Sequence, residues 1–308
     1  MSKLVVLGSV NADHVLQVPS FPRPGETLHG RNYQVIPGGK GANQAVAAAR
    51  LNADIGFIAC VGDDAFGLNI RESFQRDGID IRGVKVQPDC PTGIAMIQVS
   101  DDGENTICLS AEANAKLSSE AIQPELDQIR TANYLLMQLE TPLDGVEGAA
   151  VAAKASKTCV VLNPAPACPL PDSLLRCVDV ITPNETEAEV LTGIKVTDEE
   201  SAQQAANVLH EKDIETVLIT LGAKGVWLSQ NGVGEGISSY RVEAVDTTAA
   251  GDTFNGALVT GLLENKPLES AIQFANAAAA LSVTRFGAQT SIPTRKEVDD
   301  FLEKQLNR

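Results

Sequence analysis

The sequence predicts an α/β fold, in which a central, mostly parallel β-sheet lies between two layers of helices in a three-layer sandwich. Short apolar runs alternate with helical patterns along most of the chain, and runs that are apolar on both faces are typical of a parallel sheet covered on both sides. Two further segments alternate between apolar and polar residues, which predicts a small second sheet. No linker or internal repeat interrupts the chain, so we expect a single domain over residues 1–308.

The central strands are expected in six apolar runs that are bounded by turn residues. These runs are 3–8, 54–62, 132–139, 157–163, 177–183 and 215–222. Helical spacing of apolar residues predicts helices over 41–53, 65–78, 143–156 and 198–212. One more helix is expected to begin near Asp252, because Phe254, Leu258 and Leu262 recur at helical spacing.

The second sheet is expected from insertions at about 14–39 and 92–114, which show no helical pattern. In the second of them, "DDGEN" at 101–105 is a typical hairpin turn. Two such insertions would form a lid over one edge of the binding pocket. A lid sheet with an open apolar face is also a natural dimer interface, so we expect a homodimer.

Composition excludes several classes of function. A formal net charge of −16 disfavours binding to nucleic acid and to anionic membrane surfaces. The chain shows no apolar run long enough to span a bilayer and no charged-then-apolar leader. Its 6 cysteines never form a Cys-x-x-Cys spacing and it has only 3 histidines, which disfavours a zinc site. Scattered thiols of this kind are typical of a reduced, cytoplasmic protein.

Polar clusters follow five of the expected strands, at the sheet edge where open parallel sheets bind ligands. Each cluster alone is compatible with a turn or a helix start, but five at one edge predict a site. The first group offers amides and carboxylates, which suit the hydroxyl groups of an uncharged sugar. This group consists of Asn11, Asp13, Asn43 and Glu140. It contains no arginine, which disfavours a sugar phosphate.

The remaining clusters suit a nucleotide. Asn184 and Glu187 are three residues apart and suit a hydrated magnesium ion that bridges nucleotide phosphates. The cluster at 219–225 suits contacts to phosphate or ribose, although it is also compatible with a tight hairpin turn. Its candidate residues are Thr220, Gly222, Lys224 and Gly225.

The segment "DTTAAGDTF" at 246–254 places a carboxylate among small residues at a helix start. Asp252 alone is compatible with a helix cap. The small residues Ala249, Ala250 and Gly251 would expose backbone N–H groups that bind an anion. A carboxylate beside such an anion hole is suited to act as a general base in phosphoryl transfer.

These segments together resemble the ribokinase family of carbohydrate kinases. The two signature regions are "GGKGANQAVAAARL" and "DTTAAGDTFNGALVTGLL", and "LGSVNADHV", "QLETPL", "NPAPA", "TPNETEAE", "LITLGAKGVW" and "SVTRFGAQTSIP" extend the resemblance over about residues 4–305. The resemblance implies a ribokinase-like fold with a β-sheet lid through which two subunits associate. It also implies ATP-dependent phosphorylation of D-ribose at the 5-hydroxyl.

The resemblance assigns roles to individual residues. Asp252 becomes the base, and the N–H groups of residues 249–251 become the anion hole. The sugar contacts that it implies are Asn11, Asp13, Gly39, Lys40, Asn43 and Glu140. On the nucleotide side it implies Asn184, Thr220, Gly222, Lys224, Gly225, Gly251 and Asn276, with Asn184 and Glu187 acting indirectly on magnesium. A potassium site is implied at Asp246, Thr248, Ser282, Arg285, Gly287 and Ser291, partly through backbone carbonyls.

The sequence differs from the family pattern at one position, and two alternative functions remain open. The family often has glycine where this chain has Ala249, and we expect only a small effect. The first rival is a related kinase that acts on a nucleoside or another sugar. The second is a sugar sensor that has lost catalysis. An aromatic content of 4% disfavours a nucleoside pocket, and the retained Asp252 disfavours a sensor.

Overall fold

A computed structural model describes residues 3–306, and its main feature is a large, mostly parallel sheet. The strands run in the order β13 (Val233–Ile237), β12 (Val226–Gln230), β11 (Thr216–Thr220), β10 (Val180–Ile181), β9 (Cys159–Leu162), β8 (Tyr134–Met137), β1 (Leu4–Leu7), β4 (Ile55–Gly62) and β5 (Val84–Gln87). From β11 to β5 all neighbours are parallel, whereas β12 pairs antiparallel with both β11 and β13. The six predicted strands are confirmed, and β5, β12 and β13 are additions at the two edges.

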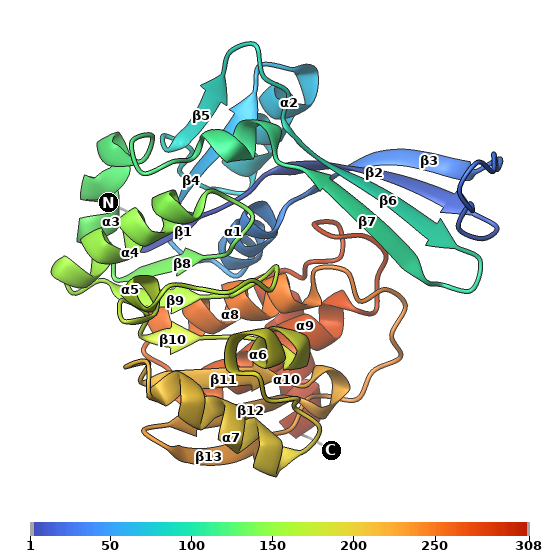
Figure 1. The fold of residues 1–308 in the computed structure, drawn as a ribbon. Coiled ribbons are helices and arrows are strands. Elements are labelled where there is room, and N and C mark those ends of the chain that lie inside the picture. The colour runs from blue at the N-terminus through green and yellow to red at the C-terminus, as the bar shows by residue number, and fades with distance from the viewer. Residues whose placement is uncertain (1–2, 307–308) are drawn as a thin grey trace.

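Helices cover both faces of this sheet (Figure 1). One layer contains α1 (Lys40–Arg50), α2 (Ala65–Arg76), α8 (Ala250–Leu263), α9 (Leu268–Ser282) and α10 (Arg295–Leu306). The other contains α3 (Leu126–Thr131), α4 (Leu143–Ala155), α5 (Asp172–Leu175), α6 (Glu185–Thr192) and α7 (Glu199–His210). Successive residues of β1 point to opposite faces, so Leu4 and Val6 join one apolar core and Val5 and Leu7 join the other. The predicted three-layer sandwich is confirmed.

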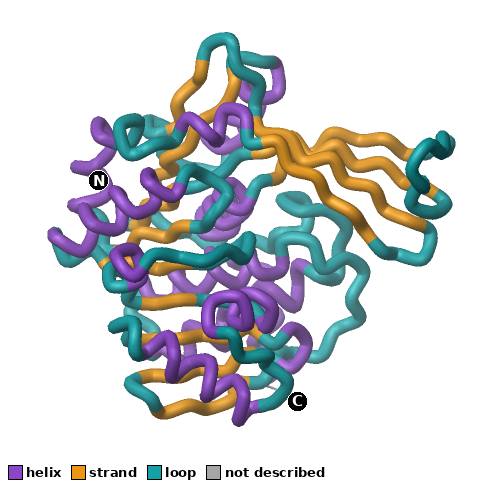
Figure 2. Tube along the Cα trace, in the orientation of Figure 1, coloured by secondary structure: helices purple, strands orange, loops and turns teal. Residues whose placement is uncertain are grey.

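A separate four-stranded sheet, which we call the lid sheet, projects from this body (Figure 2). Its order is β3 (Arg31–Gly38), β2 (Asn11–Val18), β6 (Gly93–Ser100) and β7 (Asn105–Ser110). The β6–β7 turn spans residues 101–104, where the "DDGEN" pattern predicts it. The lid strand β2 begins at Asn11, earlier than the predicted boundary of 14. Asn11 and Asp13 therefore lie within a strand of the lid sheet, and the prediction that they belong to a polar cluster directly after a central strand is wrong.

Close packing of α1 against α8 brings two distant parts of the chain together. A Cβ added at Gly256 of α8 would lie 2.7 Å from the carbonyl oxygen of Gln44 and 2.7 Å from Ala47 Cβ. A Cβ at Gly41 would lie 2.5 Å from the backbone of Gly8, at the end of β1. Glycine at these two positions therefore lets α1 pack closely against both the end of β1 and α8.

The connection between β11 and β12 is short. Residues Gly222–Lys224 form a single turn of 3-10 helix, η3, and the N–H of Leu221 donates to Gly225 O at 2.8 Å. The hairpin-turn alternative for this cluster is therefore correct as a description of its backbone. None of the helices within residues 3–306 is long and apolar enough to cross a membrane.

Candidate active site

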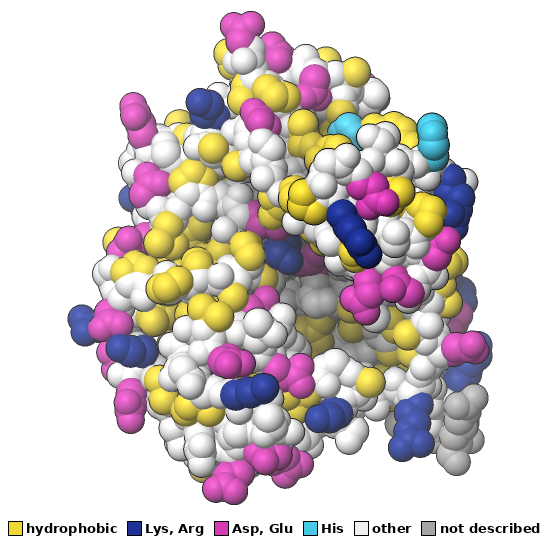
Figure 3. Space-filling model, turned by 45° about the vertical axis from the view of Figure 1, so that its right-hand side comes forward, with side chains coloured by type: hydrophobic (Ala, Val, Ile, Leu, Met, Phe, Trp, Pro, Cys, Tyr) yellow, Lys and Arg dark blue, Asp and Glu magenta, His cyan; other side chains and the backbone are white. Residues whose placement is uncertain are grey.

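A hollow lies between the lid sheet and the body, and basic and acidic side chains are visible inside it (Figure 3). One cavity of about 400 Å³ opens there. It is lined by Asn11, Leu109, Ser110, Ala111, Asn114, Ala115, Leu139, Glu140, Thr141, Pro142 and Pro166. Two predicted sugar contacts, Asn11 and Glu140, are among these residues, so this cavity adjoins the predicted acceptor site.

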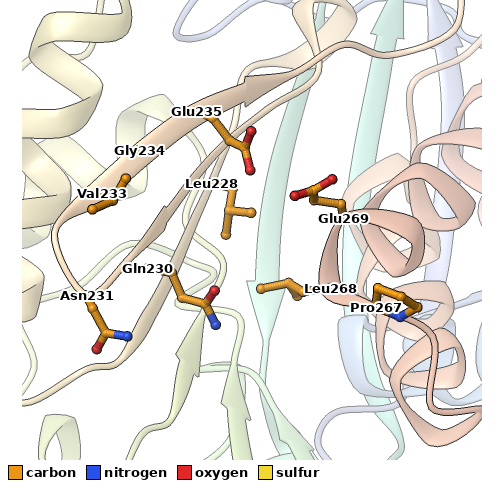
Figure 4. A pocket seen from close by; sticks show the side chains of 9 residues that line it. All are labelled: Leu228, Gln230, Asn231, Val233, Gly234, Glu235, Pro267, Leu268 and Glu269. Atoms are coloured by element: carbon orange, nitrogen blue, oxygen red, sulfur yellow. The ribbon is translucent and has the colours of Figure 1, made fainter.

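A second cavity, of about 640 Å³, lies between the β12–β13 hairpin and the start of α9. Glu235 and Glu269 extend toward one another across it (Figure 4). None of the residues that line this cavity is a predicted site residue. The first cavity, and not this one, therefore adjoins the candidate site.

Asp252 lies in the first turn of α8 and is only 7% exposed. Its Oδ2 accepts a hydrogen bond from Asn43 Nδ2 at 2.9 Å, and its Oδ1 accepts one from Gln44 Nε2 at 3.0 Å. Both donors belong to α1. The N-cap of α8 is Ala249, and no side chain caps this helix end. The carboxylate of Asp252 thus accepts hydrogen bonds from side chains of α1 and does not cap α8, so the helix-cap alternative is wrong.

Asp13 and Asn43 place unpaired acceptors in the buried part of the site. Within residues 3–306, Asp13 Oδ1 and Asn43 Oδ1 are buried and have no hydrogen-bond partner. A buried acceptor without a partner costs about 1–3 kcal/mol. A hydroxyl group is a donor that would satisfy such an oxygen, so the site is chemically suited to a polyhydroxyl ligand.

The pKa of Asp13 is strongly perturbed. Burial, and after it the carboxylates of Glu140 and Asp252, together raise it to about 7, although Lys40 opposes them. Gly38, on the neighbouring strand, leaves the space for this carboxylate, because a Cβ there would lie 2.0 Å from Asp13 Oδ2. A perturbed carboxyl group in a cavity is typical of a functional site.

Asn11 is oriented by Asn114, a buried residue of the 3-10 helix η1 (Glu112–Lys116) that the sequence analysis missed. Asn114 Nδ2 donates to Asn11 Oδ1 at 2.8 Å, and Asn114 Oδ1 accepts from the N–H of Val10 at 2.9 Å. Because its oxygen is occupied, Asn11 keeps its amide donors for a ligand. Asn11 and Asp13 therefore offer opposite hydrogen-bonding groups.

Glu140 forms hydrogen bonds with the segment between β1 and the lid strand β2 and with the start of α1. Its Oε2 accepts from Ser9 Oγ at 2.6 Å and from the N–H of Lys40 at 3.2 Å. Gly39, the N-cap of α1, has no side chain to cap this helix and adopts a φ of 90°. Glu140 therefore supplies the cap from another element, and its Oε1 stays available to a ligand. Ser9 is a second residue that the sequence analysis missed.

Lys40 lies among the carboxylates of both halves of the site. Burial lowers its pKa, but four carboxylates together outweigh burial and raise the pKa above its ordinary value. These are Asp252, Glu140, Glu187 and Asp13. Burial raises the pKa of Glu187, and Lys40 opposes this shift. The structure thus brings the acceptor residues and Glu187 within electrostatic reach of one ammonium group.

The predicted anion hole lies at the start of α8. The N–H of Ala250 donates to Thr247 O at 3.2 Å, whereas those of Ala249 and Gly251 have no protein acceptor within the described part of the chain. A Cβ added at Gly251 would meet no atom within 4 Å outside its own turns of α8, so open space adjoins this backbone. Free N–H groups at a helix N-terminus beside open space suit a phosphoryl group.

The nucleotide-side residues lie in three places. Asn184 and Thr220 are adjacent, since they form a parallel bridge and Thr220 N donates to Pro183 O at 2.9 Å. Gly222 and Gly225 adopt φ values of 56° and 110°, and Lys224 between them is exposed. Asn276, from α9, is buried and donates to Ser238 O at 3.3 Å.

Asn184 and Glu187 form a capping box at the start of α6. Asn184 Oδ1 accepts from Glu187 N at 2.8 Å, and Glu187 Oε2 accepts from Asn184 N at 2.9 Å. Across residues 3–306, no three His, Cys, Asp or Glu side chains converge as a metal-binding group. The free Glu187 Oε1 fits an indirect role, because magnesium in nucleotide sites keeps water and phosphate ligands.

The predicted potassium ligands lie on two loops that Asp246 connects. Asp246 Oδ1 accepts from Thr248 N at 2.9 Å and Oδ2 accepts from Gly287 N at 2.9 Å. The side chain of Arg285 pairs with Glu297 at 2.6 Å, so only its backbone is available. Ser282 and Ser291 are buried. A carboxylate with backbone and hydroxyl oxygens fits a monovalent cation by donor chemistry.

Comparisons with known proteins identify the family. A profile described as "pfkB family carbohydrate kinase" matches residues 1–295. The chain belongs to this family. The family resemblance noted in the sequence is therefore confirmed, and the protein is a carbohydrate kinase with both family signatures at the site just described.

Individual members of the family resemble the chain over nearly its whole length. A ribokinase of Haemophilus influenzae is 57% identical over 300 residues, which cover 97% of this chain and 98% of the relative. The structure of Arabidopsis thaliana ribokinase complexed with ribose and ATP has a TM-score of 0.92 at 36% identity and covers 98% of this chain and 99% of that one. A deoxyribokinase of Salmonella typhi is 35% identical, over 97% of this chain and 98% of its own length.

Proposed function

We propose that this protein catalyses ATP-dependent phosphorylation of D-ribose at the 5-hydroxyl, giving D-ribose 5-phosphate and ADP. The observation that carries the proposal is the pair of unpaired buried acceptors, Asp13 Oδ1 and Asn43 Oδ1, beside the carboxylate of Asp252. The relatives named ribokinase, one of them bound to ribose and ATP, support this choice of substrates.

In this proposal the buried residues bind the sugar and Asp252 activates it. Asn11 donates to ring hydroxyls, whereas Asp13, Asn43 and Glu140 accept from them. Asp252 accepts the proton of the primary hydroxyl as its oxygen attacks the γ-phosphoryl group. The N–H groups at the start of α8 stabilise the negative charge that develops on the transferring phosphoryl group.

The two ions have supporting roles in the proposal. Magnesium would neutralise charge on the nucleotide phosphates when it is bound, and Asn184 and Glu187 would orient it through water. The loops at 246–248 and 282–291 would hold potassium. Asp246 already hydrogen-bonds both loops, so an ion there would stiffen the backbone that leads into the anion hole.

We also propose that the protein is a cytoplasmic homodimer that associates through the lid sheet. Tyr33, Val35 and Met96 are exposed apolar residues on the lid face that is opposite to Asp13. Their burial in a dimer would remove apolar surface from water. The 6 cysteines are free thiols, which supports a reducing compartment. The lid role and the single-domain division over residues 1–308 stay predictions.

The rival acceptors differ in what their pockets require. The cavity lining contains no aromatic residue to stack on a nucleobase and no arginine or lysine to bind a sugar phosphate. The one lysine among the predicted sugar contacts, Lys40, is already surrounded by four carboxylates. The deoxyribokinase relative makes 2-deoxyribose the strongest alternative acceptor.

The test is a panel of acceptors in an ADP-release assay. Ribose, deoxyribose, fructose, adenosine and fructose 6-phosphate are compared with and without potassium. We expect ribose to have the highest kcat/KM. Turnover that prefers adenosine or fructose 6-phosphate, with ribose at background, would overturn the assignment and leave the kinase family unchanged.

A further inference from the structure

A group of buried polar side chains is connected to Asp252 by hydrogen bonds and lies outside the lining of the cavity. Its members come from α1, from the ends of the central strands and from α8. They are Gln44, Gln138, Asn163, Thr182 and Asn255, and none is more than 7% exposed. None of them has a part in the function proposed above, and none lines the cavity beside the lid sheet.

The first arm of this group fixes the amide of Gln44. Gln44 Oε1 accepts from Gln138 Nε2 at 2.6 Å. Gln44 Nε2 then donates to Asp252 Oδ1 at 3.0 Å and to Asn163 Oδ1 at 3.0 Å. An ionised carboxylate only accepts hydrogen bonds, so this amide orientation is the one that satisfies Asp252 and Asn163 together.

The second arm returns to the same turn of α8. Asn163 Nδ2 donates to Thr182 O at 3.1 Å, and Thr182 Oγ1 donates to Asn255 Oδ1 at 2.6 Å. Asn255 Nδ2 then donates to Gly251 O at 2.8 Å. Because Gly251 and Asp252 are neighbours in the chain, the two arms close a ring that holds both the carboxylate of Asp252 and the carbonyl group of Gly251, the last residue of the predicted anion hole.

The two donors to Asp252 differ in their relation to the sugar. Asn43 is a proposed sugar contact with an unpaired oxygen, so its hydrogen bonds change when a ligand binds. Gln44 is fully buried and its amide is held by protein on every side. Gln44 therefore keeps the same bond to Asp252 with and without the sugar.

We propose that Gln44 is a positioning residue for Asp252, and that the ring aligns the carboxylate with the anion hole before the sugar binds. The proposal rests on the proposed role of Asp252 as the base. A misplacement of about 1 Å in a reacting group can cost roughly 10²-fold in rate. Loss of the Gln44 amide should therefore lower kcat, and it should leave the contacts to sugar and nucleotide in place.

The first test is Gln44→Met, which keeps the length of the side chain and removes its amide. We expect kcat to fall by about tenfold to a hundredfold, while the Kd of ribose and of ATP, measured by calorimetry, stays within about threefold of wild type. The matched control is Thr158→Val. Thr158 is 2% exposed and donates to two backbone carbonyls at 3.0 Å outside the site, so its loss should lower the melting temperature and leave kcat unchanged.

The second test is Gln44→Glu, which reports on the carboxylate even if the methionine variant folds poorly. It places a second carboxyl group within hydrogen-bonding distance of Asp252 Oδ1, and like charges oppose ionisation. Lys40, Asp13 and Glu187 also act on Asp252 and are unchanged. The acid side of the kcat–pH profile should therefore move to higher pH by about one unit or more.

An Asp252→Asn protein, assayed in parallel, separates the possible failures. If Asp252→Asn is inactive while Gln44→Met turns over at the wild-type rate, or, where the methionine variant folds poorly, kcat and the pH profile of Gln44→Glu both match wild type, then the positioning role is wrong and the base is unaffected. If Asp252→Asn itself turns over like wild type, the proposed base is wrong, and the positioning role is overturned with it.

Discussion

The acceptor side of the site is made of buried side chains, whereas the nucleotide side is made largely of exposed backbone. Asn11, Asp13, Asn43 and Asp252 are each 7% exposed or less. By contrast, Gly222, Lys224 and Gly251 are exposed, and the N–H groups at the start of α8 adjoin open space. Side-chain identity should therefore determine sugar recognition, whereas backbone shape and free space should determine binding of the phosphates.

On the nucleotide side, which is made largely of backbone, we expect the largest loss of turnover from Gly251→Ala. The added methyl group meets no protein atom within 4 Å outside its own turns of α8, so it should not disturb the fold, and alanine favours a helix by up to about 1 kcal/mol. It would occupy the space in front of the anion hole, where loss of one donor typically costs about 10²–10³ in rate. We expect a melting temperature at or above that of wild type and a comparable loss of turnover. Unchanged turnover would show that this space is not used.

On the side built from side chains, Asp13→Asn should weaken ribose binding by about tenfold to a hundredfold, because a hydrogen bond to a charged group contributes about 1.5–3 kcal/mol. The ATP Kd should not change. The control is Asp198→Asn, which makes the same change at the exposed N-cap of α7 and should leave the Kd of ribose unaltered.

The same residue predicts a pH dependence. The pKa of Asp13 is raised to about 7 in the free protein, and donated hydroxyl protons favour its ionised form. Ribose affinity should therefore fall as the pH falls through about 7, and binding at neutral pH should release protons. Calorimetry in buffers of different ionisation enthalpy measures this release. It should vanish in Asp13→Asn, and an equal release in that variant would contradict the assignment.

A smaller effect is expected at the loop that leads into the anion hole. Asp246→Asn keeps one acceptor oxygen but loses the charge, so the ratio of rates in potassium and in tetramethylammonium should fall toward one. Rates are compared at several ribose concentrations. A wild-type protein that shows no preference for potassium would remove the cation site from the account.

The smallest effect is expected from Ala249→Gly. Ala249 has φ 59° and ψ 15°, a left-handed conformation that costs an L-residue about 1–2 kcal/mol. Glycine would relieve this strain but loses more chain entropy, by about 0.5–1 kcal/mol. Stability should rise by no more than about 1 kcal/mol in chemical denaturation, with turnover nearly unchanged. A clear destabilisation would mean that the methyl group has a packing role.

Local sequence patterns predicted the central strands and several of the helices, because these elements follow from the spacing of apolar residues. The apolar runs identify β1, β4 and β8 to β11, and helical spacing identifies α1, α2, α4 and α7. The β12–β13 hairpin was missed, because "VWLSQNGVGEGI" is short and only partly apolar. The position of Asn11 and Asp13 was wrong, because only residues 8–10 separate β1 from the lid strand β2.

The candidate site was predictable as a set of residue types but not as a network. Asp252 and Asn43 could be named from their motifs, but the bonds that join α1 to α8 span more than 200 residues of sequence. Asn114 and Gln44 were missed for the same reason. A buried glutamine among the alanines of "GANQAVAAA" is a polar residue on an apolar helix face, and this was the available signal for Gln44.

The central claim is that Asp252 is the base, and Asp252→Asn tests it most directly. Asparagine keeps the size of the side chain and an oxygen that can accept from Gln44 or Asn43, so the fold and both ligands should be retained. It cannot take the hydroxyl proton, and removal of a general base typically costs about 10²–10⁴ in rate. We predict a wild-type melting temperature and a ribose-dependent ADP release reduced by that factor. A folded Asp252→Asn protein that turns over within about tenfold of wild type would lie below that range and would contradict the account.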